Sequence, residues 1–256
     1  MKFVFHLGAC STTTEENVGY LMENNYRYTV TLCEWALRRR ARFVYASSAA
    51  TYGDGSQGML DDASQLESLR PLNPYGYSKH LFDLHSARRG WLSRIVGLKY
   101  FNVYGPNESH KGDMRSLVNK AFAQVLETGK INLFKSYRPE FKDGEQKRDF
   151  LYVKDAIEMT IHLATTQTAH GLFNLGSGQA RTWIDLANAV FSALSQPPQI
   201  EFIEMPAGMQ SKYQYFTQAN IDRLKSTGYS GPRFTLEEGV KDYVQNYLVP
   251  GEPLSL

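Results

Sequence analysis

Tyr75 and Lys79 lie four residues apart in the segment YGYSK, a spacing that could serve proton exchange with a substrate hydroxyl. A phenol has a pKa of about 10, and lowering it by about 2–3 units requires about 3–4 kcal/mol in favour of the phenolate. A lysine ammonium about 4 Å away supplies roughly this energy at an effective dielectric constant of about 20. A chain with 16 tyrosines is expected to hold about one such pair by chance, so the spacing needs support from its context.

That support comes from the segment SSAATYG and from Pro74. SSAATYG directly follows an apolar, strand-like run, which puts Ser48 at the carboxyl end of a strand, where open α/β sheets bind ligands. Pro74 is typical of the first residue of a helix. Tyr75 and Lys79 would then lie one turn apart on one face of that helix, whereas Tyr77 points elsewhere. With Ser48 holding the substrate oxygen, these residues predict a hydride-transfer site that uses a bound nicotinamide cofactor.

Short apolar runs rich in β-branched and aromatic residues alternate with longer amphipathic stretches along the chain. This alternation predicts an α/β fold, a doubly wound parallel (Rossmann) sheet with helices on both faces. Strands are expected at 2–9, 42–48, 94–103, 149–153 and 171–176, and helices at 15–40, 75–89, 114–128 and from Lys154.

Two other stretches are more polar and richer in proline, glycine and tyrosine, and we expect them to build a second, smaller α/β lobe. The dinucleotide-binding domain would comprise residues 1–103 and 149–176, and the substrate-binding lobe residues 104–148 and 177–256. The segment GDGSQG at 53–58 matches G-x-G-x-x-G. Phosphate binding requires a helix that begins directly after such a segment. No helix start is in the right place here, so we interpret the segment as a loop.

The composition is that of a soluble globular protein, with 256 residues, 42% of them hydrophobic and 21% charged. A net charge of +2 gives no reason to expect nucleic acid as a partner. No apolar run approaches the roughly 20 residues of a membrane span, and no signal-peptide pattern follows Met1, so we expect a cytoplasmic protein with no membrane partner. Cys10 and Cys33 form neither a metal-binding spacing nor a disulfide framework, so no metal site is expected.

The chain contains, in this order, SSAATYG, NPYGYSK, YFNVYGP, RDFLYVKDA and FNLGSG. In that order these segments resemble the extended short-chain dehydrogenase/reductase family of nucleotide-sugar epimerases and dehydratases. Within that family the chain is similar, from end to end, to the ADP-glycero-manno-heptose 6-epimerases, notably in FHLGACSTTTE, MENNY, YFNVYGPNESHKGDM, LFKSYRPEFKDGEQKRDF and YQYFTQANI. The resemblance implies that the C6″ alcohol of an ADP-heptose is oxidised to a ketone and that the hydride returns to the opposite face. It also implies tightly bound NADP, with NAD possible, a role in lipopolysaccharide core biosynthesis and a homo-oligomer.

The resemblance assigns roles to individual residues. Tyr75 and Lys111 would be the acid–base residues for the two substrate faces. Ser48 would polarise the reacting oxygen, and Lys79 would hold the nicotinamide ribose while tuning Tyr75. The cofactor would contact Gly8, Ala9, Cys10, Ser11, Asn24, Lys79 and Val103. The substrate would contact Asn102, Asp113, Lys120, Phe134, Lys135, Ser136, Arg148 and Tyr213.

Simpler interpretations stay open for two of these residues. Lys111 lies in a polar segment and could be an ordinary exposed lysine. Arg148 is suited to a diphosphate because a guanidinium forms paired hydrogen bonds with phosphate oxygens. It could equally form a salt bridge with Asp149 or another neighbour.

The family begins with a strand, a G-x-x-G-x-x-G turn and a helix, and these 256 residues contain no such segment. About two βαβ-scale units, on the order of 60 residues, would be missing, and FVFHLGA would become an exposed apolar edge strand. We therefore expect residues 1–256 alone to bind NADP negligibly, to lack epimerase activity and to self-associate. Two alternatives stay open. One is a different nucleotide-sugar epimerase or dehydratase, although the Asp-Glu pair usual in dehydratases is missing here; the other is a non-catalytic fragment.

Overall fold

The computed structural model describes residues 2–210 and 213–251, which fall into two compact units. The first unit comprises the residues up to Phe101 together with Ile157–Gly176 and Ala219–Gly231, and the second comprises Asn102–Ala156, Ser177–Gln218 and the residues from Pro232 onward. The expected α/β fold with a parallel sheet is confirmed.

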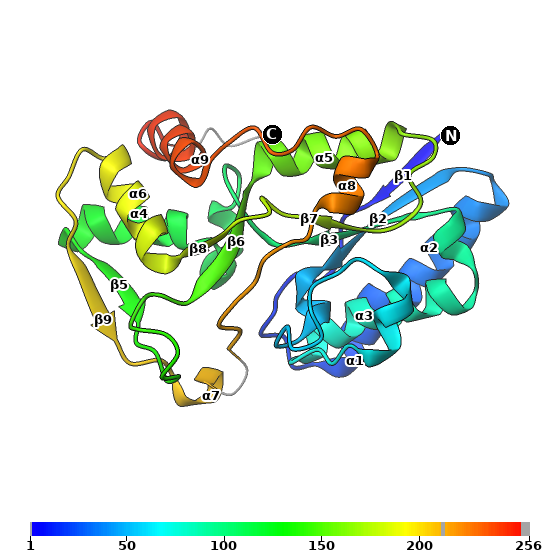
Figure 1. The fold of residues 1–256 in the computed structure, drawn as a ribbon, viewed down its shortest axis with the longest axis horizontal. Coiled ribbons are helices and arrows are strands. Elements are labelled where there is room, and N and C mark those ends of the chain that lie inside the picture. Colours follow the sequence, from blue (N-terminus) through cyan, green and yellow to red (C-terminus); the bar gives the residue numbers. More distant parts are fainter. Residues whose placement is uncertain (1, 211–212, 252–256) are drawn as a thin grey trace. The chain divides into compact units, whose positions relative to one another are not determined.

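The strands of the first unit form one parallel sheet in the order β1-β2-β3-β7 (Figure 1). They span Phe3–His6 (β1), Arg42–Ser48 (β2), Val96–Tyr100 (β3) and Gly171–Leu175 (β7). Figure 1 shows α2 and α3 on one side of this sheet and α5 on the other. Helices on both faces explain why the central strands are almost entirely apolar and buried.

The helices of the first unit lie close to their expected positions. The helix expected at 15–40 is a helical run made of α1 (Val18–Leu21), a π-helical segment (Met22–Arg27) and α2 (Tyr28–Arg38). The helix expected at 75–89 is α3 (Pro74–Arg88), which begins where the Asn73 side chain accepts a hydrogen bond from the Gly76 backbone N–H at 2.7 Å. The unit also contains α8 (Asp222–Ser226) and the part of α5 (Val153–Thr165) from Ile157 onward.

The outermost strand, β1, has an apolar face that its own unit leaves uncovered. Phe3 and Phe5 alternate along it and Leu7 follows its end, and these side chains are 37%, 48% and 46% exposed, respectively. Such a strand edge with exposed apolar side chains is what we expected for FVFHLGA. Whether it causes self-association stays a prediction.

The second unit has a three-stranded sheet in the order β4-β6-β8 and a parallel strand pair, β5 with β9. Its strands span Asn102–Tyr104 (β4), Ile131–Phe134 (β5), Lys147–Tyr152 (β6), Ala180–Thr182 (β8) and Ile200–Ile203 (β9). Its helices are α4 (Leu117–Thr128), α6 (Trp183–Ala193), α7 (Ala207–Gln210) and α9 (Leu236–Tyr243). Side chains from α4, α6, α9, β5 and β6 form its apolar core.

Strand β6 changes the domain boundaries drawn from the sequence. We placed 149–153 with the dinucleotide-binding domain, but β6 pairs in parallel with β4 and antiparallel with β8, both in the second unit. The strand expected at 94–103 is likewise divided, since β3 belongs to the first unit and β4 to the second. Residues 219–231, which we assigned to the substrate lobe, group with the first unit. An apolar run indicates a strand but does not identify its partner.

Residues 2–210 and 213–251 lack both a membrane-spanning helix and a metal-binding cluster. They contain no helix with the length and apolar character needed to cross a membrane. In the same stretches, no group of three or more His, Cys, Asp or Glu side chains is arranged to hold a metal ion.

Candidate active site

Ser48 is the last residue of β2 and the first residue of a tight turn. Its hydroxyl oxygen accepts a hydrogen bond from the Ala50 backbone N–H at 3.1 Å, which starts a 3-10 turn at Ala49–Tyr52. The Thr51 hydroxyl donates to the Ser48 carbonyl oxygen at 2.7 Å. Ser48 is therefore held through both its side chain and its backbone at the carboxyl end of the strand, as we expected.

Tyr75 lies in the first turn of α3 and is 7% exposed. Burial raises the pKa of its phenol above the ordinary value, and a hydrogen bond with the Ser48 side chain opposes this rise. The hydrogen bond brings together the two residues that the sequence placed at the reaction centre. Tyr77, by contrast, is 43% exposed and does not pack in the interior, and the choice of Tyr75 as the acid–base residue stays a prediction.

Lys79 follows Tyr75 by one turn and is also buried. Burial lowers the pKa of its ammonium to about 8. The negative charge of Asp83 raises this pKa but does not offset the effect of burial. The ammonium donates a hydrogen bond to the carbonyl oxygen of Ala46 in β2 at 3.0 Å.

In the protein alone, Lys79 is not among the groups that shift the pKa of Tyr75, so its tuning of this phenol stays a prediction. The net direction for Tyr75 is upward, because removing the phenol from water favours its neutral form. In this structure Tyr75 is a protonated acid at neutral pH. Its use as a base requires further positive charge close to the phenol.

The loop after β1 carries four of the expected cofactor contacts, Gly8, Ala9, Cys10 and Ser11. Asn25, which is 1% exposed, holds this loop: its side-chain oxygen accepts from the Cys10 backbone N–H at 2.9 Å, and its side-chain N–H donates to the Cys10 carbonyl oxygen at 3.0 Å. It also donates to the Ser78 hydroxyl on α3 at 2.9 Å.

Asn24, the residue that we named, instead donates to the Tyr20 carbonyl oxygen of its own helical run. Sequence reasoning missed Asn25, which lies in the π-helical segment. Such segments often mark functional sites, although a sequence does not show where they form.

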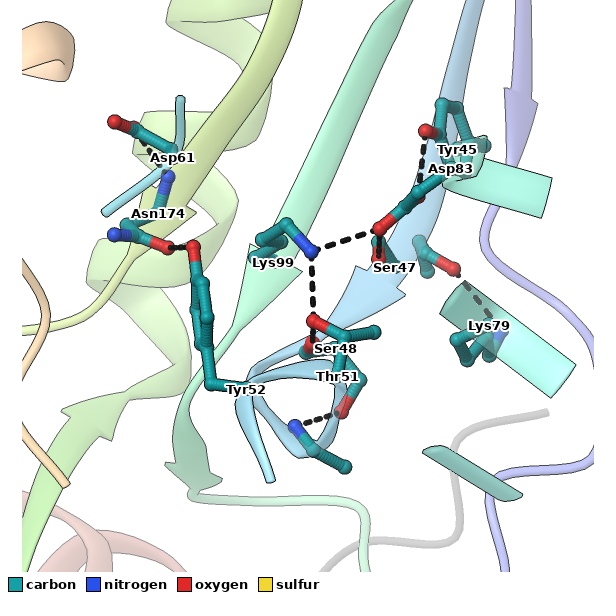
Figure 2. A network of polar contacts seen from close by, with 12 residues as sticks. Tyr45, Ser47, Ser48, Thr51, Tyr52, Asp61, Lys79, Asp83, Lys99 and Asn174 are labelled. Carbon is teal, nitrogen blue, oxygen red and sulfur yellow. Dashed lines mark hydrogen bonds and ion pairs between the residues drawn. The ribbon is translucent and has the colours of Figure 1, made fainter. Parts of the chain in front are cut away.

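A second group that sequence reasoning missed is a buried polar network around Asp83 of α3 and Lys99 of β3 (Figure 2). The Lys99 ammonium lies 2.8 Å from the Asp83 carboxylate, and both side chains are at most 1% exposed. Asp83 also accepts hydrogen bonds from the hydroxyls of Tyr45 and Ser47, at 2.8 and 2.7 Å. A lysine within the apolar run IVGLKYF was the available signal.

In the second unit, Arg148 of β6 is a buried cation between aromatic rings. Its guanidinium carbon lies 4.9 Å from the ring centre of Tyr213 and 5.6 Å from that of Trp183. The Trp183 indole N–H donates to the Tyr213 hydroxyl at 2.8 Å, which fixes the two rings. Trp183 was not among the expected site residues.

Among the ion pairs of the described residues, the salt bridge considered between Arg148 and Asp149 is not found. The Asp149 carboxylate instead accepts hydrogen bonds from Ser177 and from the Gly178 backbone N–H. The guanidinium of Arg148 donates to the Lys147 carbonyl oxygen at 2.9 Å, and burial lowers its pKa. Across the described part of the chain, no carboxylate lies within ion-pair distance of Arg148. A buried guanidinium without an acidic partner is suited to bind an anionic ligand.

The other expected substrate contacts in the second unit form two groups. Phe134, Lys135 and Ser136 lie at the carboxyl end of β5, where the Lys135 ammonium lies 2.6 Å from the Glu204 carboxylate. Asp113 and Lys120 contact each other, since the Lys120 ammonium donates to the Asp113 carbonyl oxygen.

Lys111 is exposed in the 3-10 segment Ser109–Met114, and Asn102 and Val103 lie in β4. Exposure suits both interpretations of Lys111, the catalytic one and the ordinary one. The segment GDGSQG forms turns, and the next helical element is the short 3-10 helix Ala63–Ser68, so no helix begins directly after the segment, which confirms its interpretation as a loop.

The residues around Lys79 fit a nicotinamide nucleotide. Among the described residues, the Lys79 ammonium has one hydrogen-bond acceptor, so further N–H donors of this buried group are available to ribose hydroxyls. A Cβ atom added at Gly8 would meet no atom within 4 Å, so the backbone of the loop after β1 is open to a ligand. A buried phenol, a buried ammonium and an open backbone are groups that can bind and orient such a cofactor.

Comparison with known proteins agrees with this geometry. Residues 1–176 match the family model described as the NAD dependent epimerase/dehydratase family. The chain is 53% identical over 251 residues to an ADP-L-glycero-D-manno-heptose-6-epimerase of Nitratidesulfovibrio vulgaris (strain DP4), covering 98% of this chain and 77% of that protein. It is 46% identical over 257 residues to the protein of the same name from Fusobacterium nucleatum, covering 97% and 77%.

Among solved structures, the Helicobacter pylori ADP-L-glycero-D-manno-heptose-6-epimerase superposes with a TM-score of 0.81 at 30% identity, covering 96% of this chain and 72% of that one. A UDP-N-acetylglucosamine 4-epimerase from Methanobrevibacter ruminantium M1 superposes with a TM-score of 0.82 at 22% identity, covering 98% and 77%. The second similarity concerns the fold alone.

Proposed function

The chain belongs to the NAD dependent epimerase/dehydratase family, and from this membership we propose that it epimerises an ADP-glycero-manno-heptose at C6″. The observation that carries the proposal is the 53% identity with a protein of that named activity over 98% of the chain. The contact between Ser48 and Tyr75 supplies the chemistry that an epimerase needs. The product would be the heptose donor for the lipopolysaccharide core.

The reaction begins with the removal of a proton from the C6″ hydroxyl. Tyr75 exchanges this proton through its phenol, and Ser48 holds the same substrate oxygen by a hydrogen bond. Because both side chains are held at the end of β2 and the start of α3, little motion is needed to align them. A ketone at C6″ is the intermediate, and it allows the configuration to invert.

The cofactor of this family is a pyridine nucleotide, and when bound it would supply the hydride chemistry at C6″. We propose NADP as the form used here and Lys79 as the residue that binds its nicotinamide ribose. The loop of Gly8, Ala9, Cys10 and Ser11, together with Asn24 and Val103, supplies the remaining proposed contacts. Since the hydride that leaves also returns, no net oxidation occurs.

Inversion requires that the hydride return to the opposite face of C6″. In that orientation of the substrate, a second group must exchange a proton with the C6″ oxygen. We propose Lys111 as the group that serves that orientation. Its exposure leaves the ammonium accessible to a ligand. Arg148, close to the rings of Tyr213 and Trp183, binds the diphosphate, because it is buried and has no carboxylate partner among the described residues.

The test is a product assay on the protein as its gene encodes it. ADP-glycero-manno-heptose of one C6″ configuration is incubated with catalytic amounts of enzyme, and the two epimers are separated by chromatography. We expect a mixture of both epimers with no accumulation of reduced cofactor. Turnover of UDP- or dTDP-hexoses with no change in the ADP-heptose would contradict the proposal.

A further inference from the structure

The turn that carries Ser48 is connected to a charged pair in the interior of the first unit (Figure 2). The Lys99 ammonium donates to the Thr51 hydroxyl oxygen at 2.6 Å, and the Thr51 hydroxyl donates in turn to the Ser48 carbonyl oxygen at 2.7 Å. Two hydrogen bonds in series therefore join a buried cation to the backbone of the residue that contacts Tyr75.

The other side of Lys99 is held by Asp83. Lys99 and Ser47 are directly paired in the register of β3 and β2, and both side chains reach the same carboxylate oxygen of Asp83, at 2.8 and 2.7 Å. Tyr45, two residues before Ser47, occupies the second carboxylate oxygen. The carboxylate thus accepts three hydrogen bonds, which compensate for the loss of its hydration.

This arrangement fixes the direction of the Lys99 ammonium. Its contacts are the Asp83 carboxylate, the Thr51 hydroxyl and the ring of Tyr52, whose centre lies 4.8 Å away. Side chains that are at most 1% exposed have no room for another arrangement. Each contact is charge-assisted or lies in a low-dielectric surrounding, where such bonds are strongest.

We propose that Lys99 is a positioning residue for the epimerisation: through Thr51 it fixes the Ser48 carbonyl, and so aims the Ser48 hydroxyl at Tyr75. The inference rests on the proposed function for its kinetic meaning. Lys99 itself touches neither Tyr75 nor Lys79 in the network; it acts through the turn. Neither Lys99 nor Thr51 belongs to the residues that the resemblance assigned.

Asp83 gives the network a second connection to the site. It lies one turn after Lys79 on α3, and its charge raises the pKa of Lys79 against the lowering by burial. Because Lys99 already forms the close ion pair with Asp83, Lys79 is left with the Ala46 carbonyl as its hydrogen-bond partner. The ion pair therefore leaves Lys79 available to a ligand.

The test uses Thr51→Val, which keeps the branched shape and removes the hydroxyl. If the hydroxyl aims Ser48, kcat falls about tenfold, the rate equivalent of about 1.4 kcal/mol, while KM for the sugar nucleotide stays within about twofold. Thr51→Ser keeps the hydroxyl and should restore most of kcat. Lys99→Arg should retain more activity than Lys99→Met, since it keeps the charge beside Asp83.

The matched control is Tyr52→Phe. Tyr52 lies in the same 3-10 turn, and its hydroxyl donates to Asn174 at 2.7 Å, so the variant removes a buried hydrogen bond of the same length on the opposite side of the turn. It should lower Tm about as much as Thr51→Val and leave kcat within about twofold. Equal kcat values for the two variants would overturn the proposal, because only Thr51 leads to Ser48.

A readout without substrate separates this inference from the proposed function. The Ala50 backbone N–H donates a hydrogen bond to the Ser48 hydroxyl oxygen. The rate at which this amide hydrogen exchanges with solvent therefore reports whether the Ser48 hydroxyl stays in its position. Thr51→Val should speed this exchange about tenfold, whereas Tyr52→Phe should not. If wild-type protein leaves ADP-heptose unchanged, the proposed function fails, and the exchange comparison still supports or overturns the role of the network in positioning Ser48.

Discussion

Asn25 satisfies both backbone hydrogen-bonding groups of Cys10, accepting from its N–H at 2.9 Å and donating to its carbonyl oxygen at 3.0 Å. The pair joins the loop after β1 to the π-helical segment, and the third bond of Asn25, to Ser78, joins both to α3. A loop held in this way keeps its shape before a ligand arrives, which reduces the entropic cost of binding.

We predict that Asn25→Ala weakens binding of the nicotinamide nucleotide about tenfold. The loop of Gly8 to Ser11 would lose two hydrogen bonds and would have to be ordered by the ligand, at a cost of about 1–2 kcal/mol. Calorimetric titration measures the change. Asn17→Ala is the control, because it removes an asparagine hydrogen bond from the same helical run without touching the loop. An equal loss of affinity in both variants would contradict a specific role for Asn25.

Tyr75→Phe should lower kcat for epimerisation about 10²–10⁴-fold, the range typical of a lost acid–base group. Tyr75 is 7% exposed and Phe fills the same space, so Tm should change little. Tyr77→Phe, on the same helix but 43% exposed, should retain full activity. Near-normal turnover in Tyr75→Phe would remove this residue from the proton exchange.

Lys79→Met should abolish activity and yet stabilise the fold at pH 7. The folded-state pKa of about 8 lies below the ordinary 10.5, so the folded chain binds the proton less tightly than the unfolded chain. The resulting penalty is fully present below pH 8 and disappears as the pH rises from 8 to 10.5. We expect a gain on the order of 2–3 kcal/mol at pH 7, reduced by the lost hydrogen bond to Ala46.

Urea denaturation of wild type and Lys79→Met at pH 7 and at pH 10 measures this effect. The advantage of the variant should shrink at the higher pH. Lys142→Met, at an exposed lysine, should show no gain at either pH. If Lys79→Met is less stable than wild type at pH 7, the prediction is wrong. The contacts of the Lys79 ammonium would then offset the full free-energy cost of its burial.

Lys111→Met should lower kcat at least tenfold and leave the affinity for the nicotinamide nucleotide unchanged, because its proposed work is proton exchange with the substrate. Lys111 is exposed, so no effect on Tm is expected. Steady-state kinetics and a cofactor titration on the same preparation provide both readouts. If Lys111→Met behaves like Lys142→Met, Lys111 is an ordinary surface lysine.

Arg148→Met should raise KM for the ADP-sugar about 10–100-fold, since a charge-assisted hydrogen bond contributes about 1.5–3 kcal/mol. The free protein should not be destabilised, because Arg148 has no carboxylate partner in the stretches that the structure describes. Inhibition by ADP alone measures the nucleotide part of the effect. Arg181→Met, which breaks an ion pair with Glu237, should destabilise without changing KM.

Local sequence determined the elements of this protein and the pairing of Tyr75 with Lys79. Apolar runs predicted β1, β2, β3 and β7, and Pro74 predicted the start of α3, because the periodicity and backbone preferences involved act over a few residues. The same local rule places residues four apart on one helix face.

Contacts between distant residues decided what the pattern left open. Strand β6 joins β4 and β8 because edge hydrogen bonding and packing select its partners, and no feature within 149–153 encodes that choice. The ion pair likewise joins Asp83 to Lys99, which lie 16 positions apart. The hydrogen bonds of Asn25 join it to Cys10, which lies 15 positions away. The pKa of Tyr75 moves upward rather than downward because burial, which only the folded chain creates, outweighs the hydrogen bond with Ser48 that lowers it.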